Sequence, residues 1–331
     1  MSDRTGLPVI AVDAMGGDHG PDVVVPGAVA ALADESGFAL ALYGDEAAIR
    51  GQLDRLDVAD RPVSVVPCTQ DIEMGESPAA AIRARPDSPI VKAMTACREG
   101  RASAVVSAGS TGAMVAASLI VLGRLAGVDR PAIATVIPTA AGRVLLLDAG
   151  ANTQCKPEHL LSFARMGSVY AREVFGVAEP RVGLLNIGAE AKKGNDLTTA
   201  AHAILAAADL PFVGNVEGNE LLLDPADVVV TDGFTGNNTL KIVEGIARFL
   251  VALSRRPDLD DGERAAFAPV LRYLQREFSY EVAGGAVLLG VDGISIIAHG
   301  RSSAQAITNA VKVAWQQVRA DLPARIAAAH A

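Results

Sequence analysis

The clearest indication of the fold is the segment Val9-Ile10-Ala11-Val12-Asp13-Ala14-Met15-Gly16-Gly17-Asp18-His19-Gly20-Pro21. Its first four residues form an uninterrupted apolar run, which predicts a strand buried on both faces of a sheet. The glycine-rich segment after this run predicts a tight loop, and helical periodicity begins at Asp22. Strand, loop and helix in this order are typical of parallel α/β proteins.

The same order recurs along the chain. Further apolar runs of strand length lie at Ala39–Leu42, Val63–Val66, Ala104–Val106, Val144–Leu147, Val182–Leu185, Val228–Val230 and Ile294–Ala298. Segments with helical periodicity accompany them, at Asp22–Ala33, Ala113–Leu125, His159–Val174, Thr198–Ala207, Thr239–Leu253 and Ser303–Val318. This alternation predicts an α/β fold with a doubly wound parallel sheet.

One segment, Arg255–Tyr280, breaks the alternation. It opens with a polar, acidic stretch, and apolar residues then recur every three or four positions, as in an amphipathic helix: Phe267, Val270, Leu271, Leu274 and Phe278. No low-complexity linker divides the rest of the chain. We therefore expect residues 1–331 to form a single domain with a protruding helical insertion at about 255–280.

Composition excludes several classes of protein. Half of the 331 residues are hydrophobic and a fifth are charged, which excludes intrinsic disorder. No apolar run reaches the length of about 18 residues that a membrane-spanning helix needs. The first strand follows without a signal-peptide pattern, and the three cysteines form no Cys-x-x-Cys pair, so we expect a cytoplasmic protein with reduced thiols. The net charge of −9 argues against a nucleic-acid partner.

Small, hydroxylated and amide residues follow five of the predicted strands. They occupy Asp13–Pro21, Ser107–Gly112, Asn186–Asn195, Thr231–Asn238 and His299–Ser303. In a parallel sheet these segments meet at the carboxyl edge, where open α/β sheets bind ligands. Glycines let backbone N–H groups approach an anion closely, and Lys193 and Arg301 are the cations best placed to join them. The alternative is that these residues only make tight turns, but five such loops favour an anion-binding site.

The motifs that the chain lacks narrow its chemistry. It contains no dinucleotide fingerprint Gly-x-Gly-x-x-Gly, no nucleotide P-loop and no Gly-x-Ser-x-Gly elbow. It also lacks His-Glu-x-x-His, clustered cysteine and histidine, and the His-x-x-x-x-Asp motif of many glycerolipid acyltransferases. We therefore expect no metal and no cofactor.

Five motifs together resemble bacterial phosphate acyltransferase, the acyl-[acyl-carrier-protein]:phosphate acyltransferase of phospholipid synthesis. They lie at Ile10–Asp18, Ser107–Ala113, Leu147–Asn152, Val230–Asn237 and Ile297–Ala304, in the family's order. The resemblance implies that orthophosphate attacks the thioester of a long-chain acyl-carrier protein. It also implies a Rossmann-like three-layer α/β/α fold, as in isocitrate/isopropylmalate dehydrogenases, and a homodimer. The product, acyl phosphate, would pass to a membrane-bound glycerol-3-phosphate acyltransferase.

The substrate-binding residues that we assign serve an anion. Orthophosphate is already substantially ionised near neutral pH, so holding it beside the thioester is harder than activating it. Ser110, Thr111 and the N–H groups around Gly112 are the expected phosphate cradle. Arg301 would offset the charge of the phosphate through a bidentate contact. Asn186 and Ser302 complete the expected substrate-binding set.

The residues that we assign to catalysis are Lys193, His299, Asp232 and Asn237. Lys193 would neutralise the phosphate charge. His299 could protonate the leaving thiolate, and a structural hydrogen bond at the strand end is an equally good interpretation of this histidine. Asp232 would orient Lys193 or His299. Asp13 and Asp148 also end strands, but a turn or a helix cap explains them more simply than a metal site.

The insertion bears on localisation. Asp258, Asp260, Asp261 and Glu263 precede its apolar helix, and an anionic bilayer would repel these charges. We therefore expect a cytoplasmic protein with weak, reversible contact to the membrane.

Three other functions remain open. A phosphotransacetylase-like enzyme would use a short acyl-CoA and would lack a long apolar tunnel beside the glycine-rich loops. A dehydrogenase of the same fold would need an arginine cluster and metal-binding aspartates. A non-catalytic organiser of lipid enzymes would have no use for an anion site.

Overall fold

The computed structural model describes residues 6–56, 58, 60–72, 75–277 and 284–331, and these divide into two compact units. Unit 1 consists of Met1–Pro131, Glu173–Gly176 and Gly284–Ala331, and unit 2 of Ala132–Arg172 and Val177–Ala283. The last segment of the chain therefore returns to the unit in which the first segment lies. A single domain over 1–331 stays a prediction.

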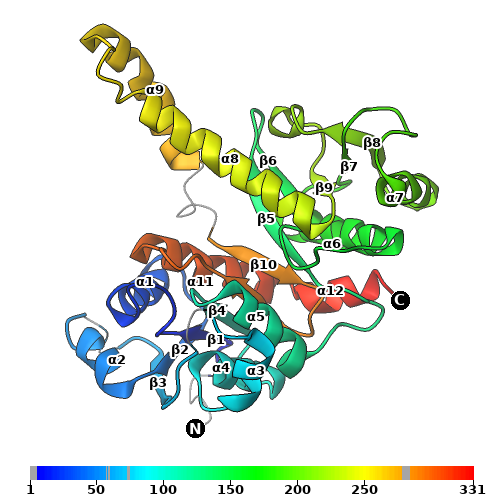
Figure 1. Ribbon diagram of the computed structural model, residues 1–331. Helices are drawn as coiled ribbons and strands as arrows, with labels where there is room; N and C mark the ends of the chain where they lie inside the picture. The colour runs from blue at the N-terminus through cyan, green and yellow to red at the C-terminus, as the bar shows by residue number, and fades with distance from the viewer. Residues whose placement is uncertain (1–5, 57, 59, 73–74, 278–283) are drawn as a thin grey trace. The chain divides into compact units, whose positions relative to one another are not determined.

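Unit 1 is a mostly parallel sheet with helices (Figure 1). Its strands, in spatial order, are β3 (Val63–Pro67), β2 (Ala39–Gly44), β1 (Val9–Asp13), β4 (Ala104–Ser107), β11 (Ser295–Ile297) and β10 (Ala286–Leu289). Only β10 is antiparallel to its neighbour in this set. The helices are α1 (Pro21–Asp34), α2 (Glu46–Leu53), α3 (Pro78–Ala84), α4 (Pro89–Arg98), α5 (Thr111–Ala117), the π-helical continuation of α5 (Ser118–Leu122), α11 (Ala304–Arg319) and α12 (Leu322–Ala328).

Unit 2 repeats this plan with fewer strands. Their spatial order is β5 (Ala132–Pro138), β6 (Arg143–Leu147), β9 (Val228–Val230), β7 (Val182–Asn186) and β8 (Phe212–Glu217). Here β5 is antiparallel to β6 and the other pairs are parallel. The helices are α6 (Pro157–Phe175), α7 (Asp196–Ala207), a short 3₁₀-helix (Leu221–Leu223), α8 (Gly233–Leu253) and α9 (Asp261–Glu277).

All eight predicted strands are confirmed within a residue or two, and the predicted parallel sheet is mostly parallel, with two antiparallel pairs. The strands that the sequence reading missed are β5, β8 and β10, and two of these run antiparallel. The backbone N–H of Thr139 donates to the carbonyl of Gly142, 3.0 Å away, in a tight turn. Because this turn joins β5 directly to β6, no crossover helix separates the two strands and they must be antiparallel.

Each predicted helix is also present. The start of α8 lies at Gly233, six residues before the predicted Thr239, because the Asp232 side chain accepts the N–H of Thr235 and caps the helix there. The helix predicted in the insertion is α9, which packs against α8 in unit 2 (Figure 1). Phe278, the last residue of its predicted apolar stripe, lies outside the described residues.

The packing of α1 on α11 positions two of the loops that follow strands. A Cβ atom on Gly27 of α1 would overlap the carbonyl oxygen of Ala304, so glycine allows the two helix backbones to touch. The Thr308 hydroxyl of α11 donates to the Gly27 carbonyl at 2.8 Å. The loop before α1 and the loop before α11 are consequently held near each other.

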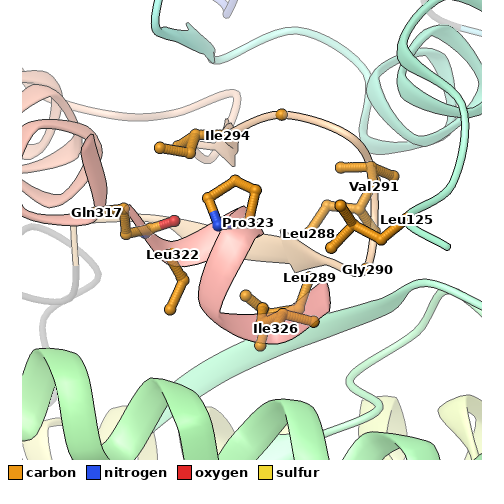
Figure 2. A pocket seen from close by; sticks show the side chains of 11 residues that line it. Leu125, Leu288, Leu289, Gly290, Val291, Ile294, Gln317, Leu322, Pro323 and Ile326 are labelled. Carbon is orange, nitrogen blue, oxygen red and sulfur yellow. The ribbon is translucent and has the colours of Figure 1, made fainter. Parts of the chain in front are cut away.

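A small, mostly apolar hollow lies in unit 1 (Figure 2). It is lined by β10, α12, Leu125 and Ile294, at the amino end of β11 and thus away from the carboxyl ends of the strands. It has about 10 Å³ for a water-sized molecule, roughly the space of one water and far less than an acyl chain needs. Gln317, a side chain only 1% exposed, lines this hollow, and its amide nitrogen has no hydrogen-bond partner among the described residues.

We expect Gln317→Leu to stabilise the fold by about 1 kcal/mol, because an unpaired buried donor costs about 1–3 kcal/mol that the apolar side chain avoids. Chemical denaturation of both proteins measures the difference. A loss of stability would mean that a water in the hollow already pairs the amide.

Candidate functional site

Three loops of unit 1 leave the carboxyl ends of β1, β4 and β11, which are neighbouring parallel strands. The N–H of Asp18 in the first loop donates to the carbonyl of Gly300 in the third, at 2.7 Å. The N–H of Ala298 donates to the carbonyl of Ser107 at 2.9 Å. These bonds bring the predicted phosphate loop and the predicted His299–Arg301 segment to the same edge of the sheet.

The second of these loops carries Ser110, Thr111 and Gly112. Ser110 is the N-cap of α5, with its hydroxyl 3.5 Å from the N–H of Ala113. Thr111 and Gly112 are exposed. The N–H groups of a first helical turn have no intrahelical acceptor, so dissolved anions can reach those of these two residues.

The third loop carries His299, Arg301 and Ser302. The Nδ1 atom of His299 accepts the backbone N–H of Arg301 at 3.1 Å, and the His299 carbonyl accepts that of Ser302 at 2.9 Å. A neutral His299 with this bond carries its proton on Nε2. Ser302 is buried, whereas the His299 and Arg301 side chains are exposed. The turn therefore presents one imidazole and one guanidinium to solvent.

Beneath these loops, Asp13 and Ser107 form a buried pair across β1 and β4. The Ser107 hydroxyl donates to Oδ2 of Asp13 at 2.6 Å and accepts the N–H of Gly109 at 3.0 Å. Oδ1 of Asp13 accepts the N–H of Met15 at 3.1 Å. A Cβ atom on Gly16 would lie 2.7 Å from the nitrogen of Gly109, so only glycine permits this approach of the two loops.

Burial raises the pKa of Asp13 from its ordinary 3.8 to about 6, although the bonds from Ser107, Met15 and Gly16 oppose the rise. Because the folded pKa exceeds the unfolded one, folding is favoured most below pH 4, and this advantage is lost as the pH rises through 6. The ionised carboxylate then costs the folded state about 3 kcal/mol at neutral pH.

In unit 2, Asn186 and Lys193 lie together. Asn186 ends β7, and its amide nitrogen donates to the backbone carbonyl of Lys193 at 3.0 Å. The oxygen of the same amide accepts the N–H of Ile187 at 2.9 Å. The Lys193 side chain is exposed, whereas both ends of the Asn186 amide are hydrogen-bonded to the backbone of the loop between the two residues.

Asp232 and Asn237 both lie at the start of α8. Both carboxylate oxygens of Asp232 accept hydrogen bonds from Thr235. The backbone N–H of Thr235 donates to Oδ1 at 2.9 Å, and its hydroxyl donates to Oδ2 at 2.7 Å. The Asn237 amide donates to the carbonyl of Ala149 at 3.1 Å. The described contacts of these two residues therefore shape the helix start and the 148–152 loop.

Asp148, at the end of β6, organises that loop. Its Oδ1 accepts the N–H groups of Ile133, Gly150 and Ala151 at 2.9–3.1 Å. Its Oδ2 accepts the N–H and the side-chain amide of Asn152 at 2.6 and 2.8 Å. Burial raises the pKa of Asp148, and the bonds from Ile133, Ala151 and Asn152 oppose that rise.

The predicted site residues thus fall into two groups. Unit 1 contains Ser110, Thr111, Gly112, His299, Arg301 and Ser302, and unit 2 contains Asn186, Lys193, Asp232 and Asn237. Sequence reasoning singled out neither Ser107 nor the buried network that it forms. The available signal was an aspartate directly after an all-apolar strand, which occurs at Asp13 and at Asp148.

The described residues contain no group of three His, Cys, Asp or Glu side chains arranged to hold a metal ion. No helix among them is both long and apolar enough to cross a membrane.

Solved structures define the fold class as a mixed α/β fold like that of the phosphotransacetylases. EutD phosphotransacetylase from Staphylococcus aureus has a TM-score of 0.63 to this chain, and a phosphotransacetylase from Streptococcus pyogenes has 0.64. Each is 16% identical and covers 94% of both chains. At this identity the likeness shows the fold alone.

The chain belongs to the fatty acid synthesis protein family, whose model matches residues 9–325. It is 48% identical to the phosphate acyltransferase of Heliobacterium modesticaldum, over 96% of each chain. It is 49% identical to that of Desulforamulus reducens, over 95% of this chain and 94% of the relative. The prediction of a phosphate acyltransferase is confirmed.

We expect Asp148→Asn to destabilise the fold by about 3 kcal/mol. An amide keeps one accepting oxygen, so its NH₂ group must face at least two of the five donors that the carboxylate satisfies. Urea denaturation measures the change. A stability equal to that of the wild type would contradict the hydrogen-bonding scheme described for this loop.

Proposed function

We propose that this enzyme transfers a long-chain fatty acyl group from acyl-[acyl-carrier-protein] to orthophosphate and so supplies acyl phosphate for phospholipid synthesis. A phosphate oxygen attacks the thioester carbonyl carbon, the C–S bond breaks, and the carrier thiolate leaves and takes up a proton. The observation that carries the proposal is the family match over residues 9–325, because it spans all five strand-end loops.

The finer architecture and the partners belong to the same proposal. The fold would be the Rossmann-like three-layer α/β/α arrangement of isocitrate/isopropylmalate dehydrogenases, and the enzyme would act as a homodimer. Acyl-carrier protein would deliver the substrate, and a membrane-bound glycerol-3-phosphate acyltransferase would receive the product. The enzyme would be cytoplasmic, with weak membrane contact, and would need no metal or other cofactor.

In this proposal the loops of unit 1 bind phosphate. The position of the exposed residues Thr111 and Gly112 in the first turn of α5 and the hydroxyl of Ser110 support this role, as does the exposed Arg301 side chain on the neighbouring loop. Ser302 is buried, so its contribution would be made through its backbone. Cationic and N–H donors preorganised around an anion act without rearranging during the reaction.

The residues of unit 2 would act on the same reaction. Lys193 would offset negative charge, and its exposure in a loop held by Asn186 supports that role. Since Thr235 occupies both oxygens of Asp232, we assign this carboxylate to holding the start of α8 rather than to proton transfer. Asn237 would fix the 148–152 loop beside it.

The competing function is a phosphotransacetylase-like reaction with a short acyl-CoA. The solved phosphotransacetylases share the fold, but at 16% identity they carry no argument about the acyl donor. The experiment incubates the purified enzyme with phosphate and either palmitoyl-carrier protein or acetyl-CoA, with a chelator present, and detects acyl phosphate by mass spectrometry. Acetyl phosphate without palmitoyl phosphate would favour the competitor.

We expect Arg301→Ala and Lys193→Ala each to lower kcat/KM for phosphate about tenfold or more, with the KM for acyl-carrier protein changed less than twofold. A charge-assisted hydrogen bond contributes about 1.5–3 kcal/mol, and the exposure of both side chains favours the lower value. Arg301→Lys would recover only part of the loss, because an ammonium makes no bidentate contact. Steady-state kinetics with each substrate varied in turn measures these changes.

His299→Ala is the control for proton transfer. If His299 protonates the thiolate, the substitution lowers kcat and removes one limb of the pH profile. If the imidazole only accepts the N–H of Arg301, thermal stability falls and the shape of the profile is retained. Wild-type phosphate kinetics in folded Lys193→Ala and Arg301→Ala proteins would rule out the phosphate site proposed here.

A further inference from the structure

The pair formed by Asp13 and Ser107 has a role beyond making a turn. From the geometry of this pair we infer that Asp13 is a positioning residue for the phosphate step, acting through Ser107 and Gly109 on the Ser110–Gly112 loop. The inference rests on the proposed function, since that function assigns the loop to phosphate.

The hydrogen-bond chain that joins these residues has a fixed direction. An ionised carboxylate can only accept, so the Ser107 hydroxyl must point its proton at Asp13 Oδ2, 2.6 Å away. A lone pair of the same oxygen then faces the N–H of Gly109 at 3.0 Å. Gly109 immediately precedes Ser110, so its amide fixes the entry of the chain into the phosphate loop.

The charge state of Asp13 decides whether this direction holds. A protonated or amidated side chain would itself donate to the Ser107 oxygen, and the serine proton would lose its only acceptor in the network. The titratable groups that act on Asp13 are the carboxylate of Asp71 and the thiol of Cys68, both after β3. Burial raises the pKa of Cys68 to about 11, so the thiol is neutral near pH 7.

The environment of Asp13 disfavours the ionised form of its side chain. The carboxylate is 3% exposed, and burial raises its pKa to about 6, so its ionised form destabilises the fold near neutral pH. An asparagine of the same shape would avoid that destabilisation. A charge retained at the expense of stability is typical of residues that serve function.

Unit 2 contains a sequence motif like the one that begins at Ser107, with a threonine in place of the serine. The sequence from Ser107 to Gly112 and the sequence from Thr231 to Gly236 both read [Ser/Thr]-x-Gly-x-Thr-Gly. Asp13 pairs in register with Ser107, and the β6–β9 register places Asp148 opposite Thr231. The counterpart position therefore carries a threonine, and Ser107→Thr keeps the hydroxyl that the inference requires.

The experiment compares Asp13→Asn, Ser107→Ala and Ser107→Thr with the full-length wild type. We expect the first two to raise the KM for phosphate about tenfold at pH 7.5, with the KM for palmitoyl-carrier protein changed less than twofold. The double variant would lose no more than either single one, because both break the same chain of bonds. Ser107→Thr would restore most of the phosphate use.

Two further readouts separate positioning from structure. At pH 7.5 Asp13→Asn would melt at a higher temperature than the wild type, and this difference would close as the pH falls from 6 to 4. The ratio of kcat/KM for phosphate between the wild type and Asp13→Asn would likewise fall toward 1 below pH 6. Ser118→Ala is the matched control, because it removes another buried hydroxyl bond of unit 1, 3.1 Å from Ser295, and would leave the KM for phosphate unchanged.

The inference is overturned if phosphate kinetics stay within twofold of the wild type in folded Asp13→Asn and Ser107→Ala. It is also overturned if Asp13→Asn is less stable at pH 7.5 and both substrates lose equally. The proposed function fails separately, when the purified wild-type enzyme forms acetyl phosphate from acetyl-CoA but no palmitoyl phosphate from palmitoyl-carrier protein.

Discussion

The strands β1 and β6 are largely apolar on both faces, and this confines their polar groups to the strand ends. Ile10–Val12 and Leu145–Leu147 bury their side chains almost completely, so neither segment can carry a functional group along its length. Where each strand ends, the backbone N–H groups of the next loop still need acceptors. Asp13 and Asp148 supply them, each as the first polar residue after its strand.

The two aspartates meet the same need in different ways. Asp148 accepts five hydrogen bonds, four of them from backbone N–H groups, so its loop is stabilised by a charge that is almost fully satisfied. Asp13 accepts fewer bonds and one of them comes from a hydroxyl, which passes its orientation on to Gly109. The first arrangement favours stability. The second exchanges stability for control over a neighbouring loop.

Much of the fold could be predicted because hydrophobic runs and helical periodicity are local properties. Two of the missed strands, Ala132–Pro138 and Ala286–Leu289, depend on contacts that are distant from any local pattern. They pair antiparallel to their neighbours, and no pattern within them specifies that direction. The loops at the strand ends could be predicted for a similar reason, since glycine and hydroxylated residues mark them directly. The burial of Asp13 and its bond to Ser107 could not, because 94 residues separate the two partners.

The same distinction explains why the candidate site was predicted by residue type but not by role. Asp232 was expected to orient another side chain, yet its oxygens are bonded three residues away at Thr235, a contact that the helix cap itself creates. A carboxylate before a helix is always a candidate for both roles, and only the positions of its neighbours decide between them. Ser107 is the opposite case, because nothing in the local sequence at the end of β4 indicates that its hydroxyl faces a charge. The contact between Ser107 and Asp13 follows from the register of β1 and β4, which no local pattern specifies.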